Sequence, residues 1–306
     1  MTYDLIIIGG GPAGAAAAVY AARKKLKTAI ITDNFGGQSV VSDDIQNWIG
    51  ETRLSGIELA KKFETHVRAQ TGIEILIGDK VSRITKAESG FELSTESGKK
   101  ISTGAILIAA GARRRKLNVS GEENFSGKGV AYCATCDAPL FAGRTVAVVG
   151  GGNAGLESAL DLELYAEKIF ILEKTNTLRG DEITLEKIKN SPKMEVIFNA
   201  EVTEIFGEKM VSGLKYKQLP EKEIKELKVD GVFVEIGSMP NSNLVSDLVE
   251  TNSRGEIIVD QKTQAASTPG IWAAGDAADG LYKQNNVAAG DAIKAVLSIS
   301  EYLRKK

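Results

Sequence analysis

Two glycine-rich loops of identical spacing constrain the fold of this 306-residue chain more than any other feature. Each loop directly follows an apolar run, at residues 3–8 and 145–149, and each precedes a helix-forming segment and a second apolar run, at 26–32 and 168–172. A strand, a G-x-G-x-x-G loop, a helix and a second strand make up a dinucleotide-binding βαβ unit. The sequence therefore predicts two such units, with their glycines at Gly9, Gly11, Gly14, Gly150, Gly152 and Gly155.

The length of the chain also favours two domains, because a single core rarely organises 306 residues. Short strand-like segments at 91–94 and at Ile101 predict small antiparallel inserts, and the runs 105–111 and 270–276 predict further buried strands. Since the last run follows the second βαβ unit, we expect one domain to interrupt the other. The predicted fold class is α/β, with two Rossmann-like dinucleotide-binding domains, the second (115–243) inserted into the first (1–114 and 244–306).

Composition narrows the class of protein. The hydrophobic fraction is 43% and no apolar run has the length of a membrane span. The first apolar run lacks a basic leader and ends in glycines, so we expect no signal peptide, no membrane attachment and a cytoplasmic protein. A net charge of -2 gives no electrostatic reason to bind nucleic acid. The one basic cluster, at 113–116, is either a solvated loop or a docking surface for an acidic partner.

Cys133 and Cys136 are the only cysteines, and they stand at C-x-x-C spacing between the two glycine loops. In a reducing compartment this spacing indicates either redox catalysis or half of a metal site. Only His66 could add a further Cys or His ligand, and its amphipathic segment suggests a residue without chemistry, so we expect no metal. The placement favours an electron relay in which one dinucleotide delivers a hydride, a second holds it, and the dithiol passes on two electrons.

Acidic residues at strand ends suggest which nucleotide each unit binds. Glu173 ends the second strand of the second unit, where a carboxylate accepts hydrogen bonds from the adenosine ribose and repels a 2'-phosphate. This favours NADH over NADPH, the alternative being a solvated charge. Asp33 is the comparable residue of the first unit, and Gly37 with Gln38 predicts either contact with a flat ligand or a surface turn. Asp276 could face a ribityl or pyrophosphate group.

These motifs together resemble those of a known family. The chain resembles low-molecular-weight thioredoxin reductases and, even more closely, the reductase portion of the alkyl hydroperoxide reductase flavoprotein subunit. The resemblance covers essentially all 306 residues. Besides the two glycine loops, it rests on Gly36-Gly37-Gln38, Asn47-Trp48, Cys133-Ala134-Thr135-Cys136-Asp137, Ile236-Gly237 with Pro240-Asn241, Ala274-Gly275-Asp276 and Lys283-Gln284.

The resemblance implies a homodimeric FAD enzyme with an inserted nicotinamide domain that carries the redox dithiol. It implies that Cys136 faces the flavin, that Cys133 attacks the substrate disulfide, and that Asp137 is the nearby acid; a helix-capping role for Asp137 is the alternative. The implied FAD ligands are Gly9, Gly11, Gly14, Gly37, Gln38, Asn47, Asp276, Lys283 and Gln284. The implied nicotinamide dinucleotide ligands are Gly152, Asn153, Ala154, Glu157 and Glu173, and we count Gly237 among the cofactor-binding residues.

Four departures from the family pattern qualify these expectations. Glu173-Lys174-Thr175 replaces the His-Arg-Arg run of NADPH-dependent members, which strengthens the prediction of NADH. Ala138 stands where glycine is usual, and Lys283 replaces an arginine, which keeps the charge but loses the planar fork. Finally, the peroxide-reductase flavoprotein has N-terminal thioredoxin-like domains, whereas this chain starts directly at the first strand.

We therefore expect the disulfide partner to be a separate protein, whether thioredoxin-like, glutaredoxin-like or linked to a peroxiredoxin. Because a dithiol cannot contact a flavin and a bulky partner at once, the linkers near Arg115 and Asn243 are predicted hinges. Two other functions stay open on sequence alone. One is a flavin disulfide reductase fed by ferredoxin, and the other is a non-enzymatic redox sensor built from the same flavin and dithiol.

Overall fold

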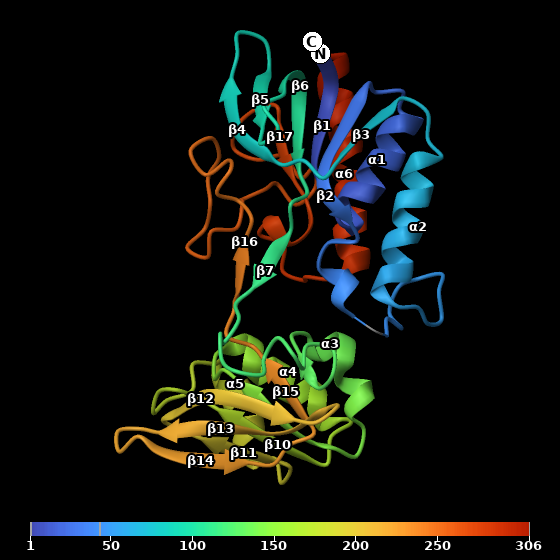
Figure 1. The fold of residues 1–306 in the computed structure, drawn as a ribbon. Coiled ribbons are helices and arrows are strands. Elements are labelled where there is room, and N and C mark those ends of the chain that lie inside the picture. Colours follow the sequence, from blue (N-terminus) through green and yellow to red (C-terminus); the bar gives the residue numbers. More distant parts are fainter. Residues whose placement is uncertain (1, 43, 306) are drawn as a thin grey trace. The chain divides into compact units, whose positions relative to one another are not determined.

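The computed structural model describes residues 2–42 and 44–305, and the chain forms two compact units (Figure 1). The first unit comprises Met1–Arg113 and Met239–Lys306, and the second comprises Arg114–Ser238. The chain passes between them twice. At these crossings β7 (Ala112–Arg114) and β16 (Ser238–Pro240) pair in a two-stranded sheet. The predicted α/β class is confirmed.

The first unit is built on a mainly parallel sheet. Its strand order is β3-β2-β1-β6-β5-β4, and β17 also pairs with β6. The strands β3, β2, β1 and β6 run parallel, as expected for successive βαβ connections, whereas β4 and β5 form an antiparallel hairpin. The bounds are β1 Thr2–Gly10, β2 Thr28–Phe35, β3 Ile73–Ile77, β4 Val81–Lys86, β5 Phe91–Thr95, β6 Lys100–Ile108 and β17 Ile271–Ala273.

One expectation for this sheet was wrong. The segment at Ile101 and the run 105–111 were predicted as separate strands, but both belong to the single strand β6, which ends at Ile108. Its first residues pair with β5 in an antiparallel manner and its last residues pair with β17 in a parallel manner, while its other edge pairs with β1. One strand can serve both partners because β5 and β17 occupy successive parts of the same edge.

Helices cover one face of this sheet. The alanine-rich α1 (Pro12–Arg23) packs against α6 (Asn285–Arg304), and the buried alanines on both helices allow close approach. The amphipathic α2 (Gly56–Arg68) buries Leu59, Phe63 and Val67 in the same core. The opposite face packs on residues 244–259, and buried side chains of β4 and β5 belong to the same second core. Two short 3-10 helices, Gly37–Val41 and Gly275–Ala277, complete the unit.

The second unit repeats the plan with a fully parallel sheet in the order β11-β10-β9-β15-β8. The bounds of β9 (Thr145–Val149) and β10 (Lys168–Leu172) agree with the predicted runs. An antiparallel sheet, β12-β13-β14, packs on the same core. The other bounds are β8 Val130–Ala131, β11 Met194–Ile197, β12 Ala200–Gly207, β13 Val211–Gln218, β14 Glu223–Leu227, β15 Gly231–Val234, α3 Ala134–Asp137, α4 Asn153–Glu163 and α5 Glu182–Asn190, with a 3-10 helix at Ala138–Phe141.

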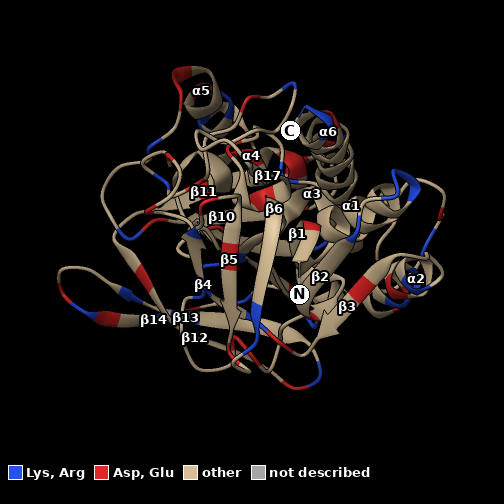
Figure 2. Ribbon diagram, turned by 90° about the horizontal axis from the view of Figure 1, so that it is seen from above, with Lys and Arg blue, Asp and Glu red and all other residues tan. Residues whose placement is uncertain are grey.

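The distribution of charged residues differs between the parallel and the antiparallel sheets. Figure 2 shows the middle of the parallel strands β1 and β6 without charged positions, whereas the antiparallel β14 carries both signs. Parallel strands are covered on both faces and therefore read as apolar runs, whereas an antiparallel edge strand can face water. Within residues 2–42 and 44–305, none of the helices is both long and apolar enough to cross a bilayer.

Candidate functional site

The first glycine of each loop has a conformation that only glycine tolerates. Gly9 has φ +111° and Gly150 has φ +124°. A Cβ atom would lie 2.3 Å from the carbonyl oxygen of Ala109 at Gly9, and 2.4 Å from that of Glu235 at Gly150. Each of these carbonyls directly follows the neighbouring parallel strand, β6 or β15. The tight turn out of the first strand is therefore built in the same way in both units.

The second and third glycines also have matching environments. A Cβ on Gly14 would lie 1.8 Å from the oxygen of Gly9, and one on Gly155 would lie 1.9 Å from the oxygen of Gly150. The third glycine thus lets the helix pack on its own loop. By contrast, a Cβ on Gly11 would meet only the Gly37 Cα at 3.8 Å, and one on Gly152 would meet nothing within 4 Å. The middle glycine therefore leaves its backbone open to a ligand, as a bound pyrophosphate requires.

Helix capping distinguishes the helices that follow these loops from α2 and α5. Neither α1 nor α4 has a side-chain cap, and neither has an acidic residue in its first turn. The same is true of α6. By contrast, Ser55 and Glu58 form a capping box on α2, and Asp181 caps α5. The uncapped N-terminal amides of α1 and α4 are available to an anion, and the helix dipole favours negative charge there.

A cavity of about 630 Å³ opens in the first unit. It lies beyond the carboxyl ends of β1, β2 and β6, where parallel sheets bind ligands, and its volume is within the range of small-molecule and cofactor pockets. Most residues predicted to bind FAD meet here, since the lining includes Gly9, Gly11, Asp33, Gly37, Gln38, Asp276, Lys283 and Gln284.

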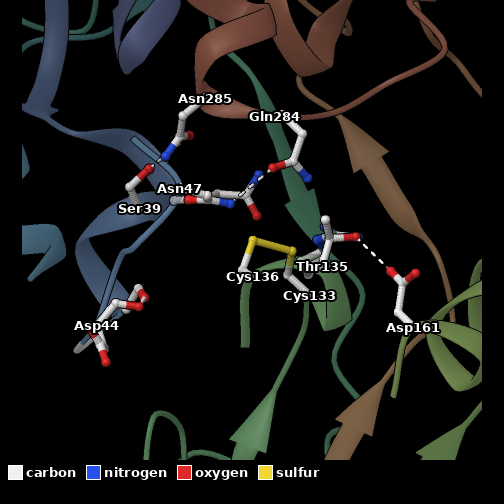
Figure 3. The surroundings of a disulfide bond; sticks show 12 residues. Ser39, Asp44, Asn47, Cys133, Thr135, Cys136, Asp161, Gln284 and Asn285 are labelled. Carbon is white, nitrogen blue, oxygen red and sulfur yellow. Dashed lines mark hydrogen bonds between the residues drawn. A yellow bond between two sulfur atoms is a disulfide. The ribbon is translucent and has the colours of Figure 1, made fainter. Parts of the chain in front are cut away.

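Two predicted ligands do not line this cavity. Gly14 is covered by the Gly9 carbonyl and supports the loop from behind. Asn47 instead donates a hydrogen bond of 3.3 Å from its side chain to Gln284 Oε1 (Figure 3). The structure therefore places Asn47 as a support for Gln284.

The cavity is also lined by residues that were not predicted to bind a cofactor. Asp79, Lys80, Asn241 and Asn243 line it. The Lys80 ammonium lies 3.0 Å from a carboxylate oxygen of the exposed Asp33, so the predicted ribose ligand has a cation beside it. Lys80 lies three residues beyond the end of β3, and its place beside Asp33 follows from the pairing of β2 with β3. The strand-end rule applied to Asp33 concerns acidic residues and gives no signal for Lys80.

Lys283 is held in place by a buried carboxylate. Its ammonium lies 3.1 Å from Glu256 and donates to the Ala278 carbonyl. Burial acts to raise the pKa of Glu256, but hydrogen bonds and charges from Asn252, Lys283 and Arg254 outweigh it, so the pKa is lowered. Glu256 therefore stays ionised at neutral pH and fixes Lys283 at the cavity wall.

In the second unit, Glu173 is buried, with 4% of its surface exposed, so the alternative of a solvated charge is wrong. Its carboxylate accepts hydrogen bonds from the amides of Gly151 (2.7 Å) and Thr175 (2.9 Å), and the Arg179 guanidinium lies 3.8 Å away. Burial acts to raise the pKa of Glu173, but these hydrogen bonds and Arg179 lower it overall. Glu173 is therefore an ionised acceptor fixed against the glycine loop.

The other predicted nicotinamide residues lie around the same loop. Asn153, Ala154 and Glu157 occupy the first turns of α4, and all three are exposed. Gly237 follows β15 with φ +103°, and its carbonyl accepts a hydrogen bond of 3.0 Å from the Arg115 amide. These residues share the carboxyl edge of the sheet with Glu173.

Cys133 and Cys136 form a disulfide across α3, with their Cα atoms 5.3 Å apart. Thr135, between them, donates a hydrogen bond of 2.9 Å to Asp161 on α4 (Figure 3). Asp137 stands at the N-cap of the next 3-10 helix, but its side chain makes no capping hydrogen bond there. The alternative role of Asp137, as a helix cap, therefore lacks the side-chain hydrogen bond to a backbone amide that defines a cap. Both cysteines are half-buried.

Another buried carboxyl group, Glu235, was not predicted from the sequence. It directly follows β15, beside the Ile236-Gly237 turn, and is 7% exposed. Burial raises the pKa of Glu235 to about 7, although Arg114, 3.9 Å away, acts in the opposite direction. A glutamate after an apolar strand gives no sign by itself that its side chain turns inward.

Comparison with known proteins gives consistent matches. Residues 3–292 match the family described as pyridine nucleotide-disulphide oxidoreductase. The chain is 40% identical over 301 residues to an NADH dehydrogenase of Bacillus subtilis and 39% identical over 305 residues to an alkyl hydroperoxide reductase component of Escherichia coli. Each alignment covers 98% of this chain but 58% of the relative, so the chain spans less than two thirds of these proteins.

Among solved structures, thioredoxin reductase from Streptococcus pyogenes is 34% identical to the chain, with a TM-score of 0.93. That alignment covers 100% of this chain and 99% of the other. The chain thus matches, over its whole length, a protein of the same extent.

Proposed function

The chain belongs to the pyridine nucleotide-disulphide oxidoreductase family, and it is therefore an oxidoreductase; we propose that it is an FAD-dependent reductase of protein disulfides that takes its electrons from NADH. The observation that carries this proposal is the occurrence of two matching three-glycine loops and one half-buried C-x-x-C disulfide in a single chain. The loops would serve two dinucleotides, and the disulfide would carry the electrons out.

FAD is assigned to the first unit. The open backbone at Gly11, the uncapped start of α1 and the cavity of about 630 Å³ suit a dinucleotide whose pyrophosphate meets the helix N-terminus. Gln38, Asp276 and Lys283 would hold the remaining polar groups. When bound, the flavin would supply the means of converting a two-electron hydride donor into a reductant of a disulfide.

NADH is assigned to the second unit, with Gly152, Asn153, Ala154 and Glu157 along its pyrophosphate path. The preference for NADH over NADPH is supported by the carboxylate of Glu173, which is ionised and fixed. It stands at the position where an acidic residue accepts hydrogen bonds from the ribose hydroxyls. A 2'-phosphate there would meet like charge. Gly237 would close the other side of the site.

The two cysteines would then pass electrons to a protein substrate. Reduction breaks the Cys133–Cys136 bond, and the Cys133 thiolate attacks the substrate disulfide to form a mixed disulfide. Cys136 then attacks Cys133, which re-forms the intramolecular disulfide and releases the reduced substrate as a dithiol. Asp137 would provide the proton at this site.

The partner is proposed as a separate thioredoxin-like or glutaredoxin-like protein, or a carrier that serves a peroxiredoxin. The names of the relatives support this range, since they include a thioredoxin reductase and an alkyl hydroperoxide reductase component. A homodimer in the cytoplasm, with residues 115–243 as the nicotinamide domain, completes the proposal.

A pair of cysteine variants tests the proposal. Cys133→Ser should lower NADH-driven reduction of a thioredoxin-like substrate at least about 1000-fold, because the attacking sulfur is lost, while NADH should still bleach the flavin. Cys136→Ser should instead accumulate a mixed disulfide through Cys133. Full turnover by Cys133→Ser would contradict the dithiol assignment, and a colourless protein that takes up no flavin would contradict the FAD assignment.

A further inference from the structure

One departure from the family pattern, Lys283 in place of an arginine, has a buried partner in the structure. The Lys283 ammonium lies 3.1 Å from Glu256 Oε1 and donates a hydrogen bond to the carbonyl of Ala278. The Lys283 side chain is 25% exposed, whereas Glu256 as a whole is 5% exposed. The ion pair is therefore largely shielded from water, where its attraction is stronger than that of a surface pair.

The other carboxylate oxygen of Glu256 is already engaged. Oε2 accepts hydrogen bonds from the side chains of Asn252 (2.7 Å) and Arg254 (3.0 Å), and the Glu256 amide donates to Asn252 Oδ1 (3.1 Å). The turn 252–256 thus orients the carboxylate independently of Lys283 and leaves Oε1 for it. A single ammonium suits one available oxygen, whereas the planar fork of an arginine binds two oxygens at once.

The ion pair closes the segment 278–283. At the start of this segment, the Ile257 amide donates to the Ala277 carbonyl (2.9 Å), and the Ile257 carbonyl accepts from the Asp279 amide (3.0 Å). Since Ile257 directly follows Glu256, this end is anchored to the turn that carries the carboxylate. At the other end, the lysine ammonium returns to the same carboxylate. Both ends of the segment are therefore fixed to one turn.

Residues that bound this segment line the cavity assigned to the flavin nucleotide. They are Asp276, Lys283 and Gln284. An ammonium group has three N–H bonds, and the oxygens of Glu256 and Ala278 engage two of them, which leaves one for an acceptor on the ligand. A donor that is fixed before the ligand arrives loses less side-chain entropy on binding than a free lysine does.

We propose that Glu256 is a positioning residue for the flavin nucleotide, which raises the affinity by holding the Lys283 ammonium at the cavity wall. The inference deepens the FAD assignment given above and rests on it. The cavity lining does not include Glu256, so the effect of this residue should disappear when Lys283 is removed.

The test is a double-mutant cycle on flavin affinity, measured by fluorescence titration of the flavin-free protein with FAD. Lys283→Met should weaken binding about 50-fold, because a charge-assisted hydrogen bond is lost. Glu256→Gln keeps the size of the side chain but removes its charge, and it should weaken binding about tenfold. The double variant should bind no more weakly than Lys283→Met alone, since Glu256 acts through Lys283. Losses that multiply, or an unchanged affinity in Glu256→Gln, would overturn the proposal.

Arg254→Gln is the matched control, because it removes a cation from the other oxygen of the same carboxylate. The Arg254 side chain is 72% exposed and does not line the cavity, so flavin affinity should change by no more than about twofold. A loss equal to that of Glu256→Gln would assign the effect to the turn 252–256 and refute the role of Lys283. If the unchanged protein bound no FAD, the FAD assignment itself would fail and this inference with it.

A measurement without flavin covers the case in which Glu256→Gln folds poorly. In protein with ¹⁵N-labelled lysine, the ammonium signal of Lys283 is identified by its loss in Lys283→Met. Nuclear magnetic relaxation should show restricted motion of this group before any FAD is added, with the exposed Lys99 and Lys209 as mobile references. A Lys283 ammonium as mobile as these two would contradict the proposal, and this result does not depend on whether the protein binds FAD.

Discussion

The two glycine loops have nearly the same backbone but differ in the acidic residue beside them. In the first unit, Asp33 is exposed and pairs with Lys80 at the rim of a large cavity. In the second, Glu173 is buried and its carboxylate is fixed by the loop amide of Gly151. The shared backbone explains why both units suit a pyrophosphate. We infer from this difference that the second unit selects its nucleotide through one fixed carboxylate at the ribose, whereas the first unit holds its ligand through many residues along the cavity wall.

The largest expected effect comes from the third glycine of each loop. Gly14→Ala and Gly155→Ala place a methyl group within 2 Å of a backbone oxygen that cannot move away, since a Cβ atom would lie 1.8 and 1.9 Å from it. Each should cost at least about 3 kcal/mol of unfolding free energy in its own unit, measured by urea denaturation. Loss below about 1 kcal/mol in either variant would show that the two loops are not built alike.

The second glycines should separate binding from stability. Gly11→Ala and Gly152→Ala add a methyl group in open space at ordinary backbone angles, so unfolding should change little. Gly11→Ala should weaken flavin binding by roughly 30-fold and spare NADH binding, whereas Gly152→Ala should do the reverse. Flavin release and stopped-flow reduction by NADH would measure the two effects. If either variant weakened both ligands equally, the assignment of one nucleotide per unit would fail.

A smaller effect is expected from the buried acid. Glu173→Gln keeps the size of the side chain but removes the charge that accepts ribose hydroxyls and repels a 2'-phosphate. The kcat/KM for NADH should fall about tenfold, and the preference for NADH over NADPH should shrink. Steady-state kinetics with both donors would measure this, and an unchanged ratio would remove Glu173 from nucleotide selection.

The corresponding substitution in the first unit, Asp33→Asn, should have the smallest effect on ligand binding. Asp33→Asn breaks an exposed ion pair with Lys80, and such pairs contribute about 1 kcal/mol or less. Flavin affinity should therefore change by no more than about threefold, measured by fluorescence titration of the flavin-free protein. A loss as large as that of Glu173→Gln on NADH would mean that the two acids act alike and that burial does not distinguish the units.

Local pattern predicted the regular parts of this fold well. The bounds of β9 and β10 followed from the order of strand, loop and helix, because that order is set within one βαβ unit. The continuity of β6 did not, since two partners on the same edge interrupt its apolar pattern.

The missed site residues share a physical reason. Lys80 and Glu235 acquire their environment from elements distant in sequence: Lys80 from Asp33, and Glu235 from α3, α4 and Arg114. No spacing rule encodes such contacts. Asn47 was predicted to bind FAD; in the structure its side chain contacts Gln284 and does not line the cavity.

The most direct test of the central claim is a stoichiometric one. The flavin-loaded protein, free of oxygen, is titrated with NADH, and the free thiols at Cys133 and Cys136 are counted by alkylation and mass shift. The account predicts two new thiols in place of the disulfide once enough NADH has been oxidised to reduce both the flavin and the dithiol. A flavin that is fully reduced by NADH while the disulfide stays intact would contradict it.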